Sequence, residues 1–174
     1  VFLRTAPTPG NLDFAQPQDR VLSITRAGAA VPYTFIDGHI VIGAAQTTAG
    51  ENELHIEFLA GDDALNRGED FLYTLFVPAR AHLAFPCFDQ PDLKGRYSLT
   101  LALPAHWAVV ANGGETARRE ENGRATVTFA ETQPLPTYLF AFTAGTFTIE
   151  SAERNGRLFR MFHRETDPAK IAHN

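Results

Sequence analysis

The segment Tyr97-Ser98-Leu99-Thr100-Leu101-Ala102-Leu103 alternates large apolar residues with small or polar ones over its whole length. Because successive side chains of a strand point to opposite faces of a sheet, this pattern predicts a half-buried strand. Leu54-His55-Ile56-Glu57-Phe58 shows the same alternation earlier in the chain. Such patterns dominate the sequence, and no segment has the spacing of a long amphipathic helix. The sequence therefore predicts an all-β fold.

Three dipeptides mark tight turns between apolar runs: Asp37-Gly38, Asn122-Gly123 and Asn155-Gly156. Each supplies the positive φ angles that a two-residue hairpin turn requires. The predicted pairs are Tyr33–Ile36 with His39–Ile42, a strand around Arg118 with Thr126–Phe129, and Phe147–Glu153 with Leu158–Phe162. Further strands are predicted at Val21–Thr25, Ala108–Ala111 and Tyr138–Phe142. The expected architecture is a mostly antiparallel β-sandwich or an open, curved sheet.

The stretch Phe71–Lys94 is irregular, because Pro78, Pro86 and Pro91 interrupt an otherwise apolar sequence. Proline cannot donate a hydrogen bond to a sheet, so these residues argue against a continuous central strand. We expect a long, packed connection, and long ordered loops are often functional. Its expected aromatic anchors are Phe71, Tyr73, Phe76, Phe85 and Phe88.

Length and charge limit what the chain can be. Its 174 residues fit one β-sheet domain spanning residues 1–174, with residues 1–20 as a loosely organised edge. A net charge of -5 and the absence of a basic, aromatic-rich patch argue against a nucleic-acid partner. No apolar run approaches the ~20 residues that a membrane helix needs. We expect a soluble, cytoplasmic protein with no membrane partner.

No self-contained catalytic motif is present. The chain lacks Gly-x-Ser-x-Gly, a phosphate-binding loop and the zinc motif His-Glu-x-x-His. Its one cysteine, Cys87, cannot form an internal disulfide, and we expect it to be a buried, small apolar residue. The sequence therefore predicts neither a metal nor another cofactor within this chain.

One run carries a specific resemblance: Phe85-Pro86-Cys87-Phe88-Asp89-Gln90-Pro91-Asp92-Leu93-Lys94, followed by Tyr97–Leu101 and Pro104-x-x-Trp107. It closely resembles a signature of the aminopeptidase N family. Ala111-Asn112-Gly113 and Thr137–Phe142 are similar to later parts of that family's pattern in order and spacing. The resemblance covers roughly Val21 to Phe162.

The resemblance implies a fold and a context. In that family the matching sequence forms an N-terminal, mostly antiparallel sheet domain over the mouth of a thermolysin-like zinc domain. The parent protein would then remove N-terminal residues from peptides, with zinc as its cofactor, and this domain would be a wall of the active-site cleft. The catalytic domain, which would follow Asn174, is the implied partner. Because the zinc ligands of the family are not in this chain, we expect it to be inactive alone.

The sequence departs from the family at Leu75 and Val77. The family usually has a polar pair at these positions, and its second member contacts the amino terminus of the substrate. Neither an isobutyl nor an isopropyl side chain can accept a hydrogen bond from an ammonium group. Arg80 lies nearby and would repel such a group. Leu75 and Val77 are therefore the substrate-facing positions implied by the resemblance, with their polar groups replaced.

The signature residues also have a structural interpretation. Phe85, Phe88 and Leu93 are expected in the core, and Pro86 and Pro91 are expected to fix the loop. We expect Asp89 and Lys94 either to form an ion pair or to satisfy backbone groups. Gln90 completes the matched run. A packing role for this segment is favoured over direct substrate contact.

Three interpretations remain open from the sequence. The first is a cleft-wall domain of a zinc aminopeptidase, which predicts an exposed apolar patch where the catalytic domain docks. The second is a noncatalytic scaffold of the same family, which Leu75 and Val77 favour. The third is a free-standing β-sandwich that binds carbohydrate or protein. A bare docking face predicts that the fragment self-associates.

Overall fold

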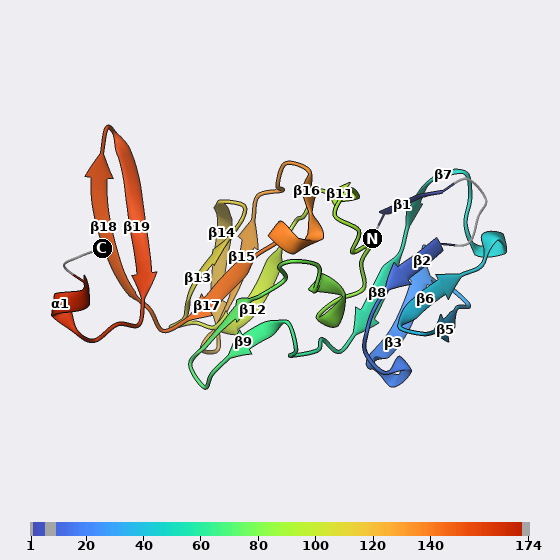
Figure 1. The fold of residues 1–174 in the computed structure, drawn as a ribbon, viewed down its shortest axis with the longest axis horizontal. Helices are drawn as coiled ribbons and strands as arrows, with labels where there is room; N and C mark the ends of the chain where they lie inside the picture. The colour runs from blue at the N-terminus through green and yellow to red at the C-terminus, as the bar shows by residue number, and fades with distance from the viewer. Residues whose placement is uncertain (1, 6–9, 172–174) are drawn as a thin grey trace.

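A computed structural model describes residues 2–5 and 10–171 of the chain. Strands account for most of its regular structure, so the all-β prediction is confirmed. Figure 1 shows three parts in a row: the N-terminal sheets, a central group of sheets and a C-terminal hairpin. Within the described residues, no helix is both long and apolar enough to cross a membrane.

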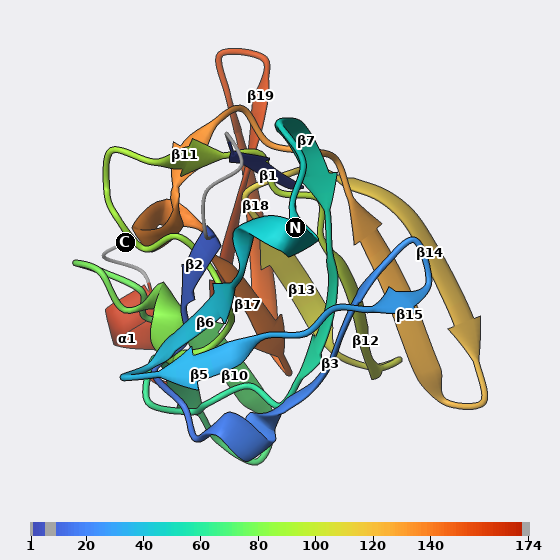
Figure 2. The same ribbon diagram turned by 90° about the vertical axis from the view of Figure 1, so that its right-hand side faces the viewer.

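The N-terminal part consists of three small antiparallel sheets, with strand orders β1-β7, β2-β6-β5 and β4-β3-β8. Its elements are β1 (Phe2–Thr5), β2 (Gly10–Asp13), η1 (Gln18–Arg20), β3 (Val21–Arg26), β4 (Ala29–Ala30), β5 (Thr34–Ile36), β6 (His39–Ile42), η2 (Ala44–Gln46), β7 (Gly50–Glu53) and β8 (His55–Phe58). Figure 2 views the molecule from this end. Leu12 and Phe14 come from the segment expected to be loosely organised, yet both are fully buried in this part's core. Residues 1 and 6–9 of that segment lie outside the described residues.

All three predicted hairpin turns form. Asp37, Asn122 and Asn155 have φ angles of 48°, 51° and 53°, and the glycine that follows each also has a positive φ. These angles are those of turns whose twist matches the strands they join. The predicted pairs are thereby confirmed as β5–β6, β14–β15 and β18–β19.

The central part contains a four-stranded sheet of order β13-β17-β10-β9, a three-stranded sheet of order β12-β15-β14 and a small β11-β16 pair. Its elements are β9 (Leu65–Arg67), β10 (Phe71–Thr74), η3 (Ala81–Leu83), β11 (Lys94–Gly95), β12 (Thr100–Pro104), β13 (Ala108–Ala111), β14 (Glu115–Glu121), β15 (Arg124–Phe129), β16 (Leu135–Pro136), η4 (Thr137–Leu139) and β17 (Phe142–Gly145). The predicted alternation from Tyr97 to Leu103 is present in the exposure of the side chains, although the strand itself begins at Thr100.

The expected irregular connection begins later than predicted. Phe71–Thr74 forms β10, which pairs with β9 on one side and β17 on the other. This strand precedes the first of the three prolines, so nothing prevents it from forming ladder hydrogen bonds. The irregular segment therefore extends from Leu75 to Leu93, with only the short η3 inside it.

The predicted strand at Tyr138–Phe142 is wrong. Thr137–Leu139 forms a 3-10 turn, and β17 begins only at Phe142. The side chain of Asn112 explains the difference, because it donates to the Leu139 carbonyl at 3.0 Å and accepts from the Ala141 N–H at 2.7 Å. A side chain thus provides hydrogen bonds that a strand partner would otherwise supply.

The apolar run instead supplies an anchor for the central core. The buried Phe140 ring is stacked on Tyr97 with centroids 4.5 Å apart, and Phe85 meets it edge-on at 5.8 Å. Phe76 is stacked on it at 6.3 Å. Two expected aromatic anchors, Phe76 and Phe85, therefore surround one residue from a distant segment.

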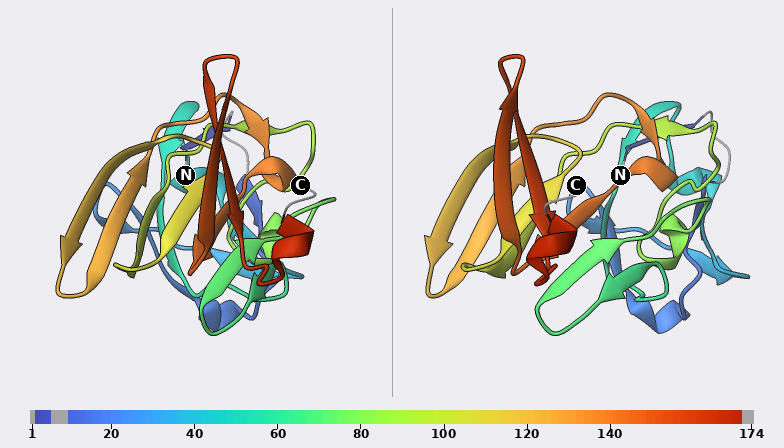
Figure 3. Two further views of the ribbon diagram at one scale, coloured as in Figure 1. Left: turned by 90° about the vertical axis from the view of Figure 1, so that its left-hand side faces the viewer. Right: turned by 60° about the vertical axis from the view of Figure 1, so that its left-hand side comes forward.

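The C-terminal part is a hairpin of β18 (Thr148–Arg154) and β19 (Arg157–His163), followed by the short helix α1 (Pro168–Ile171). Figure 1 shows this hairpin standing apart from the central sheets, and the left panel of Figure 3 views the molecule from the hairpin's end. Its base is fixed by Arg164, whose guanidinium lies 3.1 Å from Asp70 and 3.9 Å from the centroid of the Phe71 ring. The rest of the hairpin projects from the body.

Candidate functional site

The signature segment lies between the N-terminal and central parts and holds them together. The Asp13 N–H donates to the Cys87 carbonyl at 2.7 Å, and the Cys87 N–H donates back to Asp13 at 3.1 Å. The Ala15 N–H donates to the His82 carbonyl at 3.0 Å. Two segments about seventy residues apart are therefore bridged by backbone hydrogen bonds.

The Asp89 side chain is the centre of a buried polar network. Only 4% of it is exposed. One carboxylate oxygen accepts from the His82 backbone N–H at 3.2 Å and lies 2.5 Å from His82 Nδ1. The other oxygen accepts from the Thr137 hydroxyl. Asp89 therefore ties the turn containing η3 to the start of η4.

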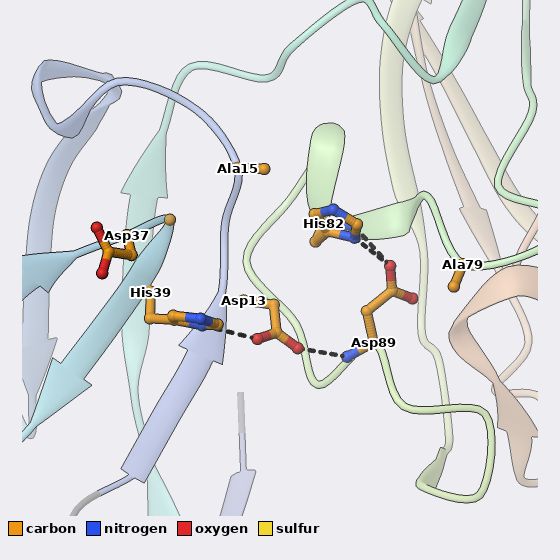
Figure 4. Close-up of a pocket in the computed structure, with 8 residues that line it drawn as sticks. Asp13, Ala15, Asp37, His39, Ala79, His82 and Asp89 are labelled. Carbon is orange, nitrogen blue, oxygen red and sulfur yellow. Dashed lines mark hydrogen bonds and ion pairs between the residues drawn. The ribbon is translucent and has the colours of Figure 1, made fainter.

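Asp13 connects this network to the N-terminal part. Its Oδ2 accepts from the Asp89 N–H at 3.1 Å and from Gln90 Nε2 at 3.0 Å, while its Oδ1 lies 2.9 Å from His39 Nδ1. The two carboxylate–imidazole pairs face a hollow of about 260 Å³, drawn in Figure 4. Its lining residues are Asp13, Ala15, Asp37, Gly38, His39, Ala79, His82 and Asp89.

The chemistry of this hollow is that of a structural network. A carboxylate beside Nδ1 fixes the orientation of an imidazole. Each oxygen of Asp13 and Asp89 already has a partner in the chain. Throughout residues 2–5 and 10–171, no group of three or more His, Cys, Asp or Glu side chains could hold a metal ion. The residues around the hollow therefore do not fit a zinc centre.

Cys87 is buried, as predicted. Burial, followed by the nearby carboxylates of Asp89 and Asp13, raises the pKa of its thiol well above the usual value. Burial also raises the pKa of Tyr97 to about 12, with smaller contributions from Cys87 and Asp89. A protonated, enclosed thiol is a poor nucleophile and a poor metal ligand. Cys87 is a packing residue.

The structural expectations for the signature have different outcomes. Phe85 packs against the central core and Phe88 against the N-terminal core, as expected, and Pro86 is buried. The expectation for Leu93 is wrong, because its side chain is 48% exposed. The turn from Gln90 to Leu93, closed by the Leu93 N–H and the Gln90 carbonyl at 3.0 Å, directs it outward together with Pro91.

The ion pair considered between Asp89 and Lys94 does not form. Asp89 pairs with His82 instead, and Lys94 lies exposed in β11. The alternative expectation is confirmed for Asp89, which accepts from a backbone N–H. His82 lies in η3, seven residues before Asp89, and the turn there brings its side chain close to the Asp89 carboxylate. Lys94 lies in the extended strand β11 that follows the loop.

Leu75 and Val77 follow β10 directly. Their side chains are 46% and 64% exposed, so both are available to a partner or ligand. Arg80, which was expected to repel an ammonium group near them, is bound to the Asp63 carbonyl through its guanidinium. The structure thus leaves these two apolar residues exposed beyond the end of β10, whereas Pro86, Cys87 and Asp89 of the signature are buried.

The sequence did not indicate Asp13, His39 or Thr137 as members of the network. Asp13 lies outside the signature, and Thr137 lies 48 positions after Asp89. The only available signal was that a charged residue inside an apolar, proline-rich segment requires hydrogen-bond partners when buried.

The Peptidase M1 N-terminal domain family matches residues 39–139, more than half of the chain. This chain belongs to the M1 peptidase family. The resemblance of its signature to aminopeptidase N is thereby confirmed, because the matched region contains the whole run from Phe85 to Lys94.

Relatives within the M1 family agree with this assignment. Probable M1 family aminopeptidase 1 of Encephalitozoon cuniculi is 30% identical over 164 residues, covering 81% of this chain and 19% of the relative. The thyrotropin-releasing hormone-degrading ectoenzyme of Homo sapiens is 33% identical over 117 residues, covering 66% of this chain and 11% of that enzyme. The chain therefore spans about a fifth or less of the length of these relatives.

The same fold occurs in a solved M1 structure. The M1 zinc metallopeptidase from Deinococcus radiodurans superimposes with a TM-score of 0.71 at 22% identity, covering 84% of this chain and 36% of the other. At this identity the likeness establishes the fold alone.

Proposed function

We propose that this chain is the non-catalytic cleft-wall domain of a zinc-dependent aminopeptidase that releases N-terminal residues from peptides. The observation that carries the proposal is the match of residues 39–139 to the N-terminal domain of M1 peptidases. The names of the relatives, which include aminopeptidases and a zinc metallopeptidase, support the reaction and the metal.

Hydrolysis is assigned to a part of the protein other than the described residues. An activated water requires three protein ligands around zinc and an open fourth position. The described part of the chain offers no group of three donors. We therefore assign zinc and peptide chemistry to the catalytic domain, and to this domain the role of limiting how a peptide approaches it.

The projecting hairpin supports the presence of a docking partner. Leu158 and Phe159 on β19 are 68% and 53% exposed, and Ile149 on β18 is 46% exposed. A two-stranded sheet with apolar residues open to water is marginally stable on its own. Ile149 pairs with Phe162, so it lies on the same face of the hairpin as Leu158, whereas Phe159 lies on the opposite face. We assign the face with Leu158 and Ile149 to contact with the catalytic domain of the same protein. Self-association of the isolated chain through it stays a prediction.

An aminopeptidase assay tests the proposal. Leucyl- and phenylalanyl-p-nitroanilide are incubated with this chain and, separately, with the protein expressed from its complete reading frame, each with zinc or with a chelator. We expect chelator-sensitive release by the longer protein and none by this chain alone. Release by this chain that a chelator abolishes would contradict the non-catalytic assignment.

A noncatalytic scaffold is the second candidate, because Leu75 and Val77 lack the polar groups expected for binding an ammonium. Silence of the longer protein toward every aminoacyl substrate, with zinc bound and the fold intact by circular dichroism, would favour it. The same result would count against the aminopeptidase proposal.

A further inference from the structure

The polar contacts between the β18–β19 hairpin and the body converge on one residue. Asp70 lies directly before β10, and it binds both legs of the hairpin: Thr146, which precedes β18, and Arg164, which follows β19. In the described part of the chain, the hydrogen bonds and ion pairs that join residues 146–164 to earlier segments all end on Asp70. We name Asp70, Thr146 and Arg164 the hairpin clasp.

Asp70 uses all three of its oxygen atoms in the hairpin clasp. Its backbone carbonyl accepts from the Thr146 N–H at 2.9 Å, and its Oδ2 accepts from the Thr146 hydroxyl at 2.9 Å. Its Oδ1 accepts from Nη2 of Arg164 at 3.1 Å. One side chain therefore ties the two legs of the hairpin to each other and to the body.

The neighbouring residue, Phe71, adds a second contact to each leg. The Arg164 guanidinium lies 3.9 Å from the centroid of its ring, within the range of a cation–π interaction. Gly145 faces Phe71 in the ladder between β10 and β17, and a Cβ there would lie 2.6 Å from the Asp70 carbonyl oxygen and 2.7 Å from Phe71 Cβ. The segment that enters the hairpin is therefore held closely against the residues that bind the segment leaving it.

The position of the hairpin clasp suits a role in direction rather than in stability. The side chains of Asp70 and Arg164 are 49% and 42% exposed, and exposed ion pairs contribute little to the free energy of unfolding. The hairpin projects beyond them, as Figure 1 shows. Each of its strands has seven residues, or about 23 Å, so a rotation of about 10° at the base moves the tip by about 4 Å.

We propose that Asp70 is a positioning residue that sets the direction of the hairpin and, through it, the placement of the catalytic domain against this domain. The second part rests on the proposed function, in which the hairpin face with Leu158 and Ile149 contacts the catalytic domain. Aspartate suits this task because its two carboxylate oxygens accept hydrogen bonds from two segments at once.

The first experiment measures the direction of the hairpin in this chain. Nitroxide labels are attached at Glu153→Cys on β18 and Thr126→Cys on β15, both exposed positions. Double electron–electron resonance then gives the distribution of distances between the labels. Cys87 is buried, so its thiol should not react with the label.

The compared variants are Asp70→Ala and Arg164→Gln, which open the hairpin clasp from its two sides. Glu69→Ala is the matched control, because it removes an exposed carboxylate next to Asp70. We expect a broader distribution with a shifted mean for the two clasp variants, and an unchanged one for the control. A distribution as narrow in Asp70→Ala as in the unchanged chain would overturn the inference. Thermal unfolding of each variant checks that the body stays folded.

The second experiment uses the protein expressed from its complete reading frame. It compares kcat/KM for leucyl-p-nitroanilide with kcat/KM for a pentapeptide that begins with leucine, since only the longer substrate extends along the cleft wall. We expect Asp70→Ala to lower kcat/KM about 10-fold for the pentapeptide and to change it little for the short substrate. Glu69→Ala should change neither.

Unchanged activity of Asp70→Ala, or an equal loss with both substrates, would overturn the role of Asp70 in placing the catalytic domain. An unmodified protein without chelator-sensitive activity would instead reject the proposed function. The distance measurement does not depend on activity, so the two failures are distinguishable.

Discussion

The signature region and the β18–β19 hairpin are built on opposite principles. Asp89 contacts residues 48 and 7 positions away through its side chain, and its N–H binds Asp13, 76 positions away. In the hairpin each residue faces a partner at most fifteen positions along the chain, as between Thr148 and His163. One region is closed by distant segments and the other by its own turn.

This difference suggests separate roles for the two regions: the signature region contributes to the stability of the fold, and the hairpin offers an exposed surface for docking. The signature region buries the Asp89 carboxylate and packs Phe85 against the central core and Phe88 against the N-terminal core. Its residues are therefore tied to the folding of both parts. The hairpin leaves Leu158 and Phe159 in water, so little of the chain's stability depends on them. A segment that matches a functional family can therefore be a structural support, while the surface proposed for docking lies elsewhere.

The largest expected effect comes from Phe140→Ala. The removed ring stacks on Tyr97 and is surrounded by Phe76 and Phe85, so the substitution leaves a cavity and lowers the free energy of unfolding by about 3–5 kcal/mol. Phe159→Ala is the control and should change it by no more than about 0.5 kcal/mol. Urea denaturation of the isolated chain measures both. An equal loss of unfolding free energy for the two substitutions would show that the hairpin contributes as much to stability as the core around Phe140.

A smaller loss, about 2–3 kcal/mol, is expected for Asp89→Ala, because the His82 N–H and the Thr137 hydroxyl lose their buried acceptor. Asp92→Ala removes an exposed carboxylate three residues later and serves as its control. The same denaturation experiment applies. A stability unchanged by Asp89→Ala would show that the network does not join the two parts.

The smallest expected effect on the free energy of unfolding comes from the ionisation of Tyr97, and it occurs only at alkaline pH. The pKa of Tyr97 is raised from 10.0 to about 12, so the unfolded chain loses this proton first. Its contribution to stability is complete below pH 10 and is lost as the pH rises toward 12. Between pH 9 and 12, the unfolding free energy of the unchanged chain should therefore fall more steeply than that of Tyr97→Phe. Parallel curves for the two proteins would refute the shift; Tyr33→Phe is the control.

The sequence alone predicted those features of the fold that depend on the conformation of a few neighbouring residues. Asp37-Gly38, Asn122-Gly123 and Asn155-Gly156 predicted three hairpins, because few residues tolerate the φ angles that these turns need. Alternation placed Leu101 and Leu103 inward and Thr100 outward, since the side-chain period of a strand is fixed. The run from Phe85 to Lys94 indicated the family because ten consecutive residues resemble its signature.

The tertiary structure alone decided where segments distant in sequence meet. The Tyr138–Phe142 run could have been a covered strand, but Asn112 binds its backbone and Phe140 inserts between Tyr97 and Phe85. Asp13, His39 and Thr137 join the candidate site only because folding brings three parts of the chain around Asp89. Local preferences fix backbone angles over a few residues. The partners of a buried charge are instead fixed by the packing of distant segments, which no short stretch of sequence determines.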